Sequence, residues 1–273
     1  MEASTSAVAI RRPPAIGWAR LPVVVRRLII AGALIAAWHF YAVSKGPLLM
    51  ATPWQTAQAF WDGWSEGTLA DTTWQTLRLL LEGVGLGAAF AALLTAFATL
   101  SKVGEDLLIL LTSLLNPLPG VAVLPLAMLL FGINETALRF VIINATIWPI
   151  AIAVTTGFKT ANATLVAVGR NVGLSRVRVI SDVLVPAALP HMISGVKTAW
   201  AFGWRTIIAA ELVFGVAGDN RGLGNFLDNA RQYFITPDLF AGLVTIMLLG
   251  VVFETLFGFA ERRTVVRWGM KTS

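Results

Sequence analysis

Six long apolar runs restrict what this chain can fold into. A transmembrane helix needs about 20 mostly apolar residues to cross a hydrocarbon layer about 30 Å thick. The composition agrees with such helices, since 56% of the residues are hydrophobic and only 13% are charged. The pattern predicts an all-α, polytopic membrane protein with about six transmembrane helices. The runs cover residues 24–43, 73–100, 107–131, 137–157, 192–214 and 239–260.

The first apolar run follows a basic stretch, RRPPAIGWARLPVVVRR, that is similar to the start of a signal peptide. Its apolar part is long, and no cleavage site of the A-x-A kind follows it cleanly. We therefore expect a retained span. The expected domains are a cytoplasmic N-terminal segment, a transmembrane domain that includes a cytoplasmic loop, and a cytoplasmic tail. They cover residues 1–27, 28–260 with the loop at 158–190, and 261–273.

Lysine and arginine residues are concentrated in alternate connections between the runs. Positive residues accumulate on the cytoplasmic side of a membrane, and this bias sets the orientation. The outer connections then contain only Lys45, Arg221 and Arg231. Both termini are therefore predicted to be cytoplasmic. The inner residues are Arg11, Arg12, Arg20, Arg26, Arg27, Lys102, Lys159, Arg170, Arg176, Arg178, Arg262, Arg263, Arg267 and Lys271.

Composition and motifs argue against several functions. The net charge of +6 is distributed by membrane side rather than gathered on one soluble face, so nucleic acid is not an expected partner. The chain has no cysteine, and His39 and His191 lie far apart, so no metal site is predicted. There is no G-x-x-x-x-G-K-[ST] motif and no cluster of catalytic groups. We expect no cofactor bound by this chain and no enzymatic activity.

The connection at residues 45–72 contains a helix-compatible stretch after Pro53. Its aromatic residues are typical of a helix that lies in the outer interface of a membrane. A docking surface for an external partner is the alternative. The aromatic residues are Trp54, Phe60, Trp61 and Trp64.

The third apolar run is interrupted by NPLPGVAVLP. Proline removes a backbone donor and glycine loosens a helix, so backbone groups freed at membrane depth must find protein or water. The interruption predicts either the lining of a pathway or a simple packing kink. Gly83 and Gly87, in contrast, have the small-residue spacing that predicts close packing of two membrane helices.

Ionisable residues inside spans cost about 2.5 to 3.5 kcal/mol each near the membrane centre, so they usually pair or face water. Arg78 and Glu82 stand four residues apart and predict an ion pair on one helix. Lys197, Arg205 and Glu211 lie along the fifth run, and they either bind other helices or line a route. The candidate pathway residues are Pro117, Pro119, Asn144, Trp148, Trp204, Arg205 and Glu211.

A polar segment, RNVGLSRVRVISDVLVPAALPHM at residues 170–192, separates the fourth and fifth runs. Helical spacing predicts two short amphipathic segments at 164–170 and 176–185. Gly173 between them is free to take a positive φ, so the chain can bend sharply there. Pro186 and Pro190 are expected to stop the second segment before the fifth run begins. Such an organised loop is predicted to dock a partner, and a helix that rests on lipid headgroups is the alternative.

The run from Leu165 through Pro190, with Gly173 followed by VLVPAALP, resembles the cytoplasmic loop motif of binding-protein-dependent ABC importer permeases. LPGVAVLPLAMLLFGI, IIAAELVFG and RGLGNFLDNARQYF are similar to segments of the permeases for nitrate, sulfonate and taurine. The chain departs from the motif where the family usually has Glu-Ala-Ala, because Val166, Ala167 and Val168 stand there. The residues expected to couple to an ATPase are Ala167, Gly173, Leu174, Ser175, Arg178, Pro186 and Pro190.

The resemblance implies a type I ABC importer permease fold in a bacterial inner membrane. It also implies ATP-driven import of a small anion, such as nitrate, bicarbonate, taurine or another sulfonate. Two permease subunits, expected to form a homodimer, would enclose the pathway. Two cytoplasmic ATPase subunits would bind ATP and magnesium, and an external binding protein would deliver the solute. The alternative from another class is a self-sufficient carrier or channel that needs no ATPase.

Overall fold

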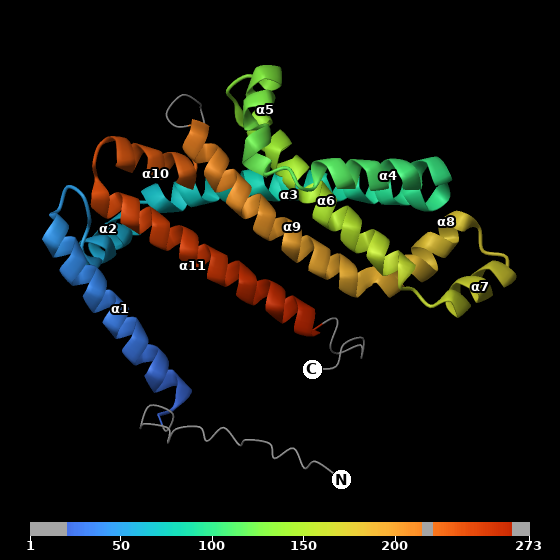
Figure 1. The fold of residues 1–273 in the computed structure, drawn as a ribbon, viewed down its shortest axis with the longest axis horizontal. Helices are drawn as coiled ribbons and strands as arrows, with labels where there is room; N and C mark the ends of the chain where they lie inside the picture. The colour runs from blue at the N-terminus through green and yellow to red at the C-terminus, as the bar shows by residue number, and fades with distance from the viewer. Residues whose placement is uncertain (1–20, 215–220, 264–273) are drawn as a thin grey trace, which may run out of the picture.

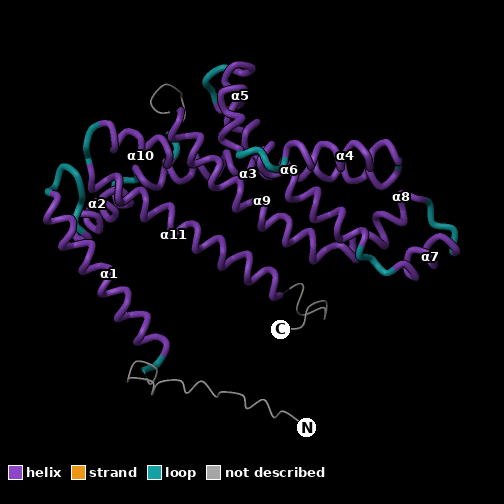
Figure 2. Tube along the Cα trace, viewed as in Figure 1, coloured by secondary structure: helices purple, strands orange, loops and turns teal. Residues whose placement is uncertain are grey.

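The computed structural model describes residues 21–214 and 221–263, and this part of the chain is helical apart from short connections (Figure 1, Figure 2). Within it, five helices are long and apolar enough to cross a membrane alone. They coincide with five of the six predicted runs, which confirms the all-α polytopic fold class. They are α1 (Val23–Lys45), α3 (Thr68–Leu100), α6 (Glu135–Lys159), α9 (Val185–Phe214) and α11 (Thr236–Glu261). The predictions for Arg11, Arg12, Arg20, Arg267 and Lys271 fall outside the described residues.

The third apolar run forms two helices that meet at a sharp bend. α4 (Lys102–Leu115) is followed by a 3-10 turn (Gly120–Val123) and α5 (Leu124–Phe131), and the two parts are bent by 95°. The predicted interruption is confirmed, and prolines explain it because they cannot donate the backbone bonds that would continue α4. Gly120 lies so close to α9 that an added Cβ would lie 2.6 Å from Thr206 Oγ1. The bend therefore packs against a neighbouring helix.

The centre of the bundle consists of α3, α6 and α9, and α6 packs along both of the others (Figure 1). Small residues permit this close approach. A Cβ on Gly83 would lie 2.5 Å from Ile142 of α6, and a Cβ on Gly87 would clash with Thr146 of the same helix. The predicted role of Gly83 and Gly87 in helix packing is confirmed.

Two short helices, α2 (Pro53–Ser65) and α10 (Leu223–Gln232), lie at the end of the bundle where α3 begins (Figure 1). α2 starts with a capping box, in which the Thr52 hydroxyl accepts from the Gln55 N–H and the Gln55 side chain accepts from the Thr52 N–H. This confirms the helix predicted after Pro53. Trp54 and Trp61 are 70% and 73% exposed, so this helix presents aromatic rings outward.

α1 diverges from the rest of the bundle (Figure 1). None of its most apolar stretch is buried. Its contact with the bundle is made near its C-terminal end, where the Trp38 ring stacks on Phe240 of α11 at 5.5 Å. The Trp38 Nε1 also donates to the Ala51 carbonyl at 3.0 Å. An apolar helix exposed to this extent requires lipid or another protein around it.

An elbow, which consists of α7 (Ala163–Asn171) and α8 (Arg176–Val179), lies at the opposite end of the bundle (Figure 1). Gly173 between the two helices has a φ of 84°, as predicted. The prediction that prolines stop the second segment is wrong. One helical stretch runs from Arg176 to Phe214 through a π-helical turn (Ile180–Leu184), and Pro186 and Pro190 lie within it. The wider π turn makes room for the proline ring that follows, so the helix continues.

Candidate functional site

A cavity of about 380 Å³ lies where the bend between α4 and α5 meets α6 and α9. It is called the bend cavity here. The break in α4 supplies one wall, and the other walls are side chains of two central helices. Five of the seven predicted pathway residues line it: Pro117, Pro119, Asn144, Trp148 and Arg205. Asn116, Leu118 and Gly120, from the interruption predicted in the third run, also line it. Sequence reasoning missed the remaining lining residues, which are Ala145, Phe202 and Thr206.

Several polar side chains of the bend cavity carry hydrogen-bond donors. The Trp148 Nε1 donates to the Asn144 Oδ1 at 3.4 Å, and this contact fixes which end of the amide is the oxygen. The Asn144 Nδ2 is buried and has no hydrogen-bond partner within the described residues. Among the described residues that line the cavity, Arg205 is the only ionisable one. A guanidinium and an unused amide donor whose residues line the same cavity are suited to an oxyanion.

The other two predicted pathway residues do not line the bend cavity. Trp204 is buried, and its ring centroid lies 6.2 Å from that of Phe253 on α11. Glu211 is fully buried and accepts hydrogen bonds from the Thr76 hydroxyl of α3 at 2.9 and 3.0 Å. It also accepts from the Gly224 N–H at the start of α10, at 2.9 Å. Of the two roles left open for Glu211, the structure shows the one in which it binds other helices.

Ion pairs hold other charged residues of the spans. The predicted pair is confirmed, with the Arg78 Nε 2.9 Å from the Glu82 Oε1. Arg139 of α6 joins it, with its Nε 2.6 Å from the Glu82 Oε2. Lys197 pairs with Glu254 of α11 at 2.6 Å, which is also a contact with another helix. The Arg139–Glu82 and Lys197–Glu254 pairs connect neighbouring helices, and none of the residues in these ion pairs lines the bend cavity.

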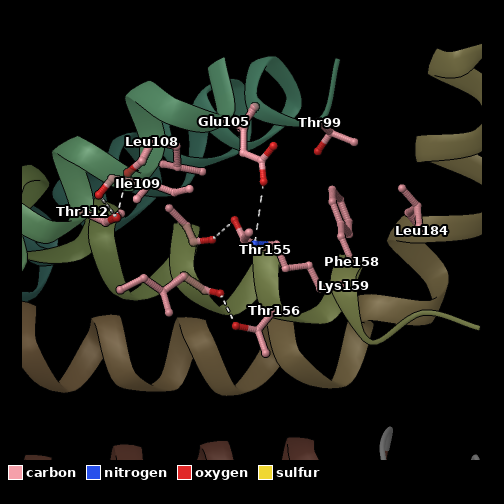
Figure 3. A pocket seen from close by; sticks show the side chains of 13 residues that line it. Thr99, Glu105, Leu108, Ile109, Thr112, Thr155, Thr156, Phe158, Lys159 and Leu184 are labelled. Carbon is pink, nitrogen blue, oxygen red and sulfur yellow. Dashed lines mark hydrogen bonds and ion pairs between the residues drawn. The ribbon is translucent and has the colours of Figure 1, made fainter. Parts of the chain in front are cut away.

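A second cavity, of about 410 Å³, lies between α4 and α6 near the elbow (Figure 3). Threonines line it, and the hydroxyls of Thr112, Thr155 and Thr156 donate to carbonyls of their own helices. Glu105 and Lys159 face each other across it at 4.0 Å. The threonine hydroxyls already donate to backbone carbonyls, and the positive charge of Lys159 is close to the negative charge of Glu105. This cavity therefore does not favour an anion. Sequence reasoning missed it because its polar residues lie in or next to three separate apolar runs.

The elbow contains five of the seven residues that were expected to couple to an ATPase: Ala167, Gly173, Leu174, Ser175 and Arg178. The Ser175 hydroxyl caps α8 by accepting from the Arg178 N–H at 3.3 Å. The Leu174 N–H donates to the Gly169 carbonyl at 3.1 Å, which closes the turn. Pro186 and Pro190 lie farther along, in α9.

Apolar side chains project from the outside of the elbow. They form the elbow ridge, whose members are between 52% and 71% exposed. Exposed apolar side chains gathered on one surface mark a protein or membrane contact. The elbow ridge consists of Leu165, Val168, Val172 and Val177.

Several known transport proteins are similar to this chain. The taurine transport system permease protein TauC of Escherichia coli K12 is 29% identical over 238 residues, which cover 84% of this chain and 85% of the relative. The putative aliphatic sulfonates transport permease protein SsuC of the same organism is 31% identical over 242 residues, covering 86% and 88%. The nitrate import permease protein NrtB of Leptolyngbya laminosa is 27% identical over 243 residues, covering 85% and 84%.

The fold also matches a solved structure. A chain from the crystal structure of an amino acid ABC transporter with histidines aligns with a TM-score of 0.59 at 16% sequence identity. The alignment covers 73% of this chain and 95% of that chain. The type I permease fold implied by the sequence resemblance is therefore confirmed.

A family model describes the inner membrane component of binding-protein-dependent transport systems, and it matches residues 83–266. The match includes the bend, the elbow, the central helices α6 and α9, and α11. This multi-pass inner membrane protein therefore belongs to that family, the permease subunits of ABC importers, within the group that serves nitrate, sulfonate and taurine.

Proposed function

We propose that this chain forms the translocation pathway for a small oxyanion in an ATP-driven importer, and that the bend cavity is part of that pathway. The solute belongs to the class of nitrate, bicarbonate, taurine and other sulfonates. One observation carries the proposal: the bend cavity combines the Arg205 guanidinium with the unused Asn144 Nδ2 donor. The names of the relatives support the same class of solute.

The donor set of the bend cavity fits transient binding. One guanidinium and one amide donor offset part of the cost of removing an anion from water, but they do not enclose it. A pathway must bind its solute well enough for entry and weakly enough for release. A permease that receives its solute from a binding protein satisfies this requirement with few polar groups.

The elbow ridge is the surface that we assign to the ATPase, in which ATP and magnesium bind. The helical stretch that starts in the elbow at Arg176 contains Arg205, about 44 Å farther along at a rise of about 1.5 Å per residue. The stretch is helical throughout, although it contains a π turn and two prolines, so a displacement at the elbow can reach the other end. Movement of the elbow by two closing ATPase subunits therefore shifts one wall of the bend cavity. Alternating access requires such a difference between two states.

The proposed assembly contains two copies of this chain, two ATPase subunits and one external binding protein. In the proposed orientation both termini and the elbow are cytoplasmic, while α2 and α10 face the binding protein. The exposed apolar surface of α1 is available to lipid and to the second copy.

Anion uptake by vesicles that contain the complete importer tests the role of Arg205. Arg205→Gln should lower the uptake rate about 10-fold, the effect of about 1.4 kcal/mol. Arg205→Glu should lower it further because it repels the anion, and Arg205→Lys should retain most of it. Lys45→Gln, which removes an exposed charge outside the bend cavity, is the matched control. Equal, normal rates in the Gln and Glu variants contradict the proposal.

The need for an ATPase is tested with the purified permease alone. Vesicles that contain only this chain should not move the anion down its gradient, and uptake should require the ATPase, ATP and the binding protein. Passive flux by the chain alone would instead support the self-sufficient carrier.

A further inference from the structure

A third cavity, of about 530 Å³, separates the elbow from the end of α3. It is called the arginine hollow here. Its walls include Thr99 and Leu100 at the end of α3, and the apolar side chains of Val166 and Leu174 from the elbow. Arg170 of α7 and Arg176 of α8 also line it. The hollow thus combines two positive charges with apolar walls. Of its lining residues, Leu174 belongs to the set expected to couple to the ATPase, and neither arginine does.

The charge in the arginine hollow is not neutralised by neighbouring side chains. No acidic residue is among its described lining residues. In the parts of the chain that the structure describes, neither Arg170 nor Arg176 takes part in an ion pair within 4.0 Å. Two cations that share one hollow repel each other, and an anion between them relieves that repulsion. The hollow is therefore a site for a negatively charged group.

The arginine hollow and the elbow ridge lie on different faces of α7. At about 100° per residue, Val166 and Arg170 lie roughly 150° around the helix from the α7 members of the elbow ridge. An ATPase that covers the ridge therefore leaves the Arg170 side of α7 to another partner. That side faces the end of α3, where a transmembrane helix reaches the edge of the bilayer.

We propose that the arginine hollow binds the phosphate-bearing headgroup of an anionic phospholipid in the cytoplasmic leaflet. The two arginines match the phosphate, and the apolar walls match the start of the acyl chains. Basic pockets beside transmembrane helices on the cytoplasmic side recognise such headgroups. A free inorganic anion carries the same kind of charge, but it has no apolar part that could contact the apolar walls. The inference rests on the proposed orientation, in which the elbow is cytoplasmic.

A lipid in this position connects the elbow to the leaflet. The elbow is joined to α6 and to the Arg176–Phe214 helix through the chain, and the bound headgroup adds a contact to α3. Bound anionic lipid should therefore fix the position of the elbow relative to the membrane surface, where the ATPase contacts it.

Lipid binding to the purified chain in detergent, measured by native mass spectrometry, tests the proposal. The probe is phosphatidylglycerol, and phosphatidylcholine is the uncharged comparison. Arg170→Ala combined with Arg176→Ala should weaken phosphatidylglycerol binding about 30-fold, the effect of two arginines near an anionic headgroup. Arg178→Ala removes the same charge from α8 outside the hollow and should change binding less than twofold. The Arg170→Lys, Arg176→Lys variant keeps the charge and should keep most of the binding.

Three results would overturn the proposal. If Arg178→Ala weakened phosphatidylglycerol binding as much as the double alanine variant, the positive charge of the whole elbow, and not the arginine hollow, would attract the lipid. Displacement of phosphatidylglycerol by millimolar inorganic phosphate would identify a free anion as the ligand. Unchanged binding in the double alanine variant, with a monodisperse elution profile that shows a folded protein, would remove the site. None of these measurements involves transport, so the lipid site can be confirmed or overturned independently of the proposed pathway.

Discussion

Glu211 shows how a single buried carboxylate can organise one end of a membrane bundle. It lies on α9 and accepts hydrogen bonds from the Thr76 hydroxyl of α3 and from the Gly224 N–H of α10. The Leu223 N–H donates to the same Thr76 hydroxyl at 2.8 Å. The carboxylate thus satisfies backbone groups at the start of α10 that the helix itself cannot satisfy. A Cβ on Gly222 would clash with it, so a glycine is needed beside the carboxylate.

Replacing Glu211 should destabilise the protein. Glu211→Ala leaves the Thr76 hydroxyl and the Gly224 N–H without this acceptor, at a cost of about 1 to 3 kcal/mol for each buried group. The unfolding temperature in detergent, followed by tryptophan fluorescence, should fall by about 3 to 10 °C. Glu211→Gln keeps one oxygen acceptor, so its unfolding temperature should fall less than that of Glu211→Ala. Asp106→Ala removes an ion pair near the start of α4 whose acid is 67% exposed, and it should change the temperature little. An unchanged unfolding temperature for Glu211→Ala would contradict the stabilising role of this carboxylate.

At the scale of elements, the elbow and the bend are both breaks in helical structure, but different physics produces them. At the bend, Pro117 and Pro119 remove two backbone donors on either side of Leu118, and α4 ends. At the elbow, Gly173 supplies a backbone conformation that other residues adopt at a cost. Pro186 and Pro190 do not break α9, because each lacks only one donor and the π turn accommodates the first ring.

Substitutions of Gly173 test the backbone conformation of the elbow without adding a steric clash at the first side-chain atom, because a Cβ at this position would meet no atom within 4 Å. Gly173→Val should disfavour the φ of 84° by about 1 to 2 kcal/mol or more and straighten the elbow. Gly173→Asn should behave almost as the parent chain, since asparagine tolerates the left-handed region. The measurement is anion uptake per ATP hydrolysed by the complete importer, together with the amount of permease in the membrane. Normal coupling in the valine variant would show that the bend is dispensable.

At the scale of the whole molecule, the charges divide along the long axis of the bundle. α2 and α10 cover one end, and the arginine-bearing elbow occupies the other (Figure 1). The bend cavity lies between these ends, against α6 and α9. This arrangement agrees with the proposed function, in which these three parts are a receiving end, a driven end and the route between them.

The proposed orientation can be measured by cysteine labelling, because the natural chain contains no cysteine. Ser65→Cys, exposed at the end of α2, should react with a membrane-impermeant maleimide on intact spheroplasts. Thr164→Cys, exposed on α7, should react only after the membrane is broken. The cysteine-free parent measures background labelling. The reverse pattern would place the elbow outside and end its assignment to the ATPase.

The sequence by itself determined the spans, the interruption of the third run, the position of the elbow and the family. These features depend on hydropathy, proline and glycine, which act on the chain locally and can therefore be identified along it. The Arg78–Glu82 pair is also local, since its members lie on one helix. The expected stop at Pro186 was wrong because a neighbouring π turn, which propensity does not show, accommodated the ring.

Only the tertiary structure decided which distant residues meet. Thr76 and Glu211 are 135 residues apart in the chain, and no local pattern indicates their contact. The bend cavity likewise requires three separate segments, and the arginine hollow requires the end of α3 to lie against the elbow. The physical reason is the packing of α3, α6 and α9. Their close approach fixes which polar side chains are buried together and which remain available to an anion.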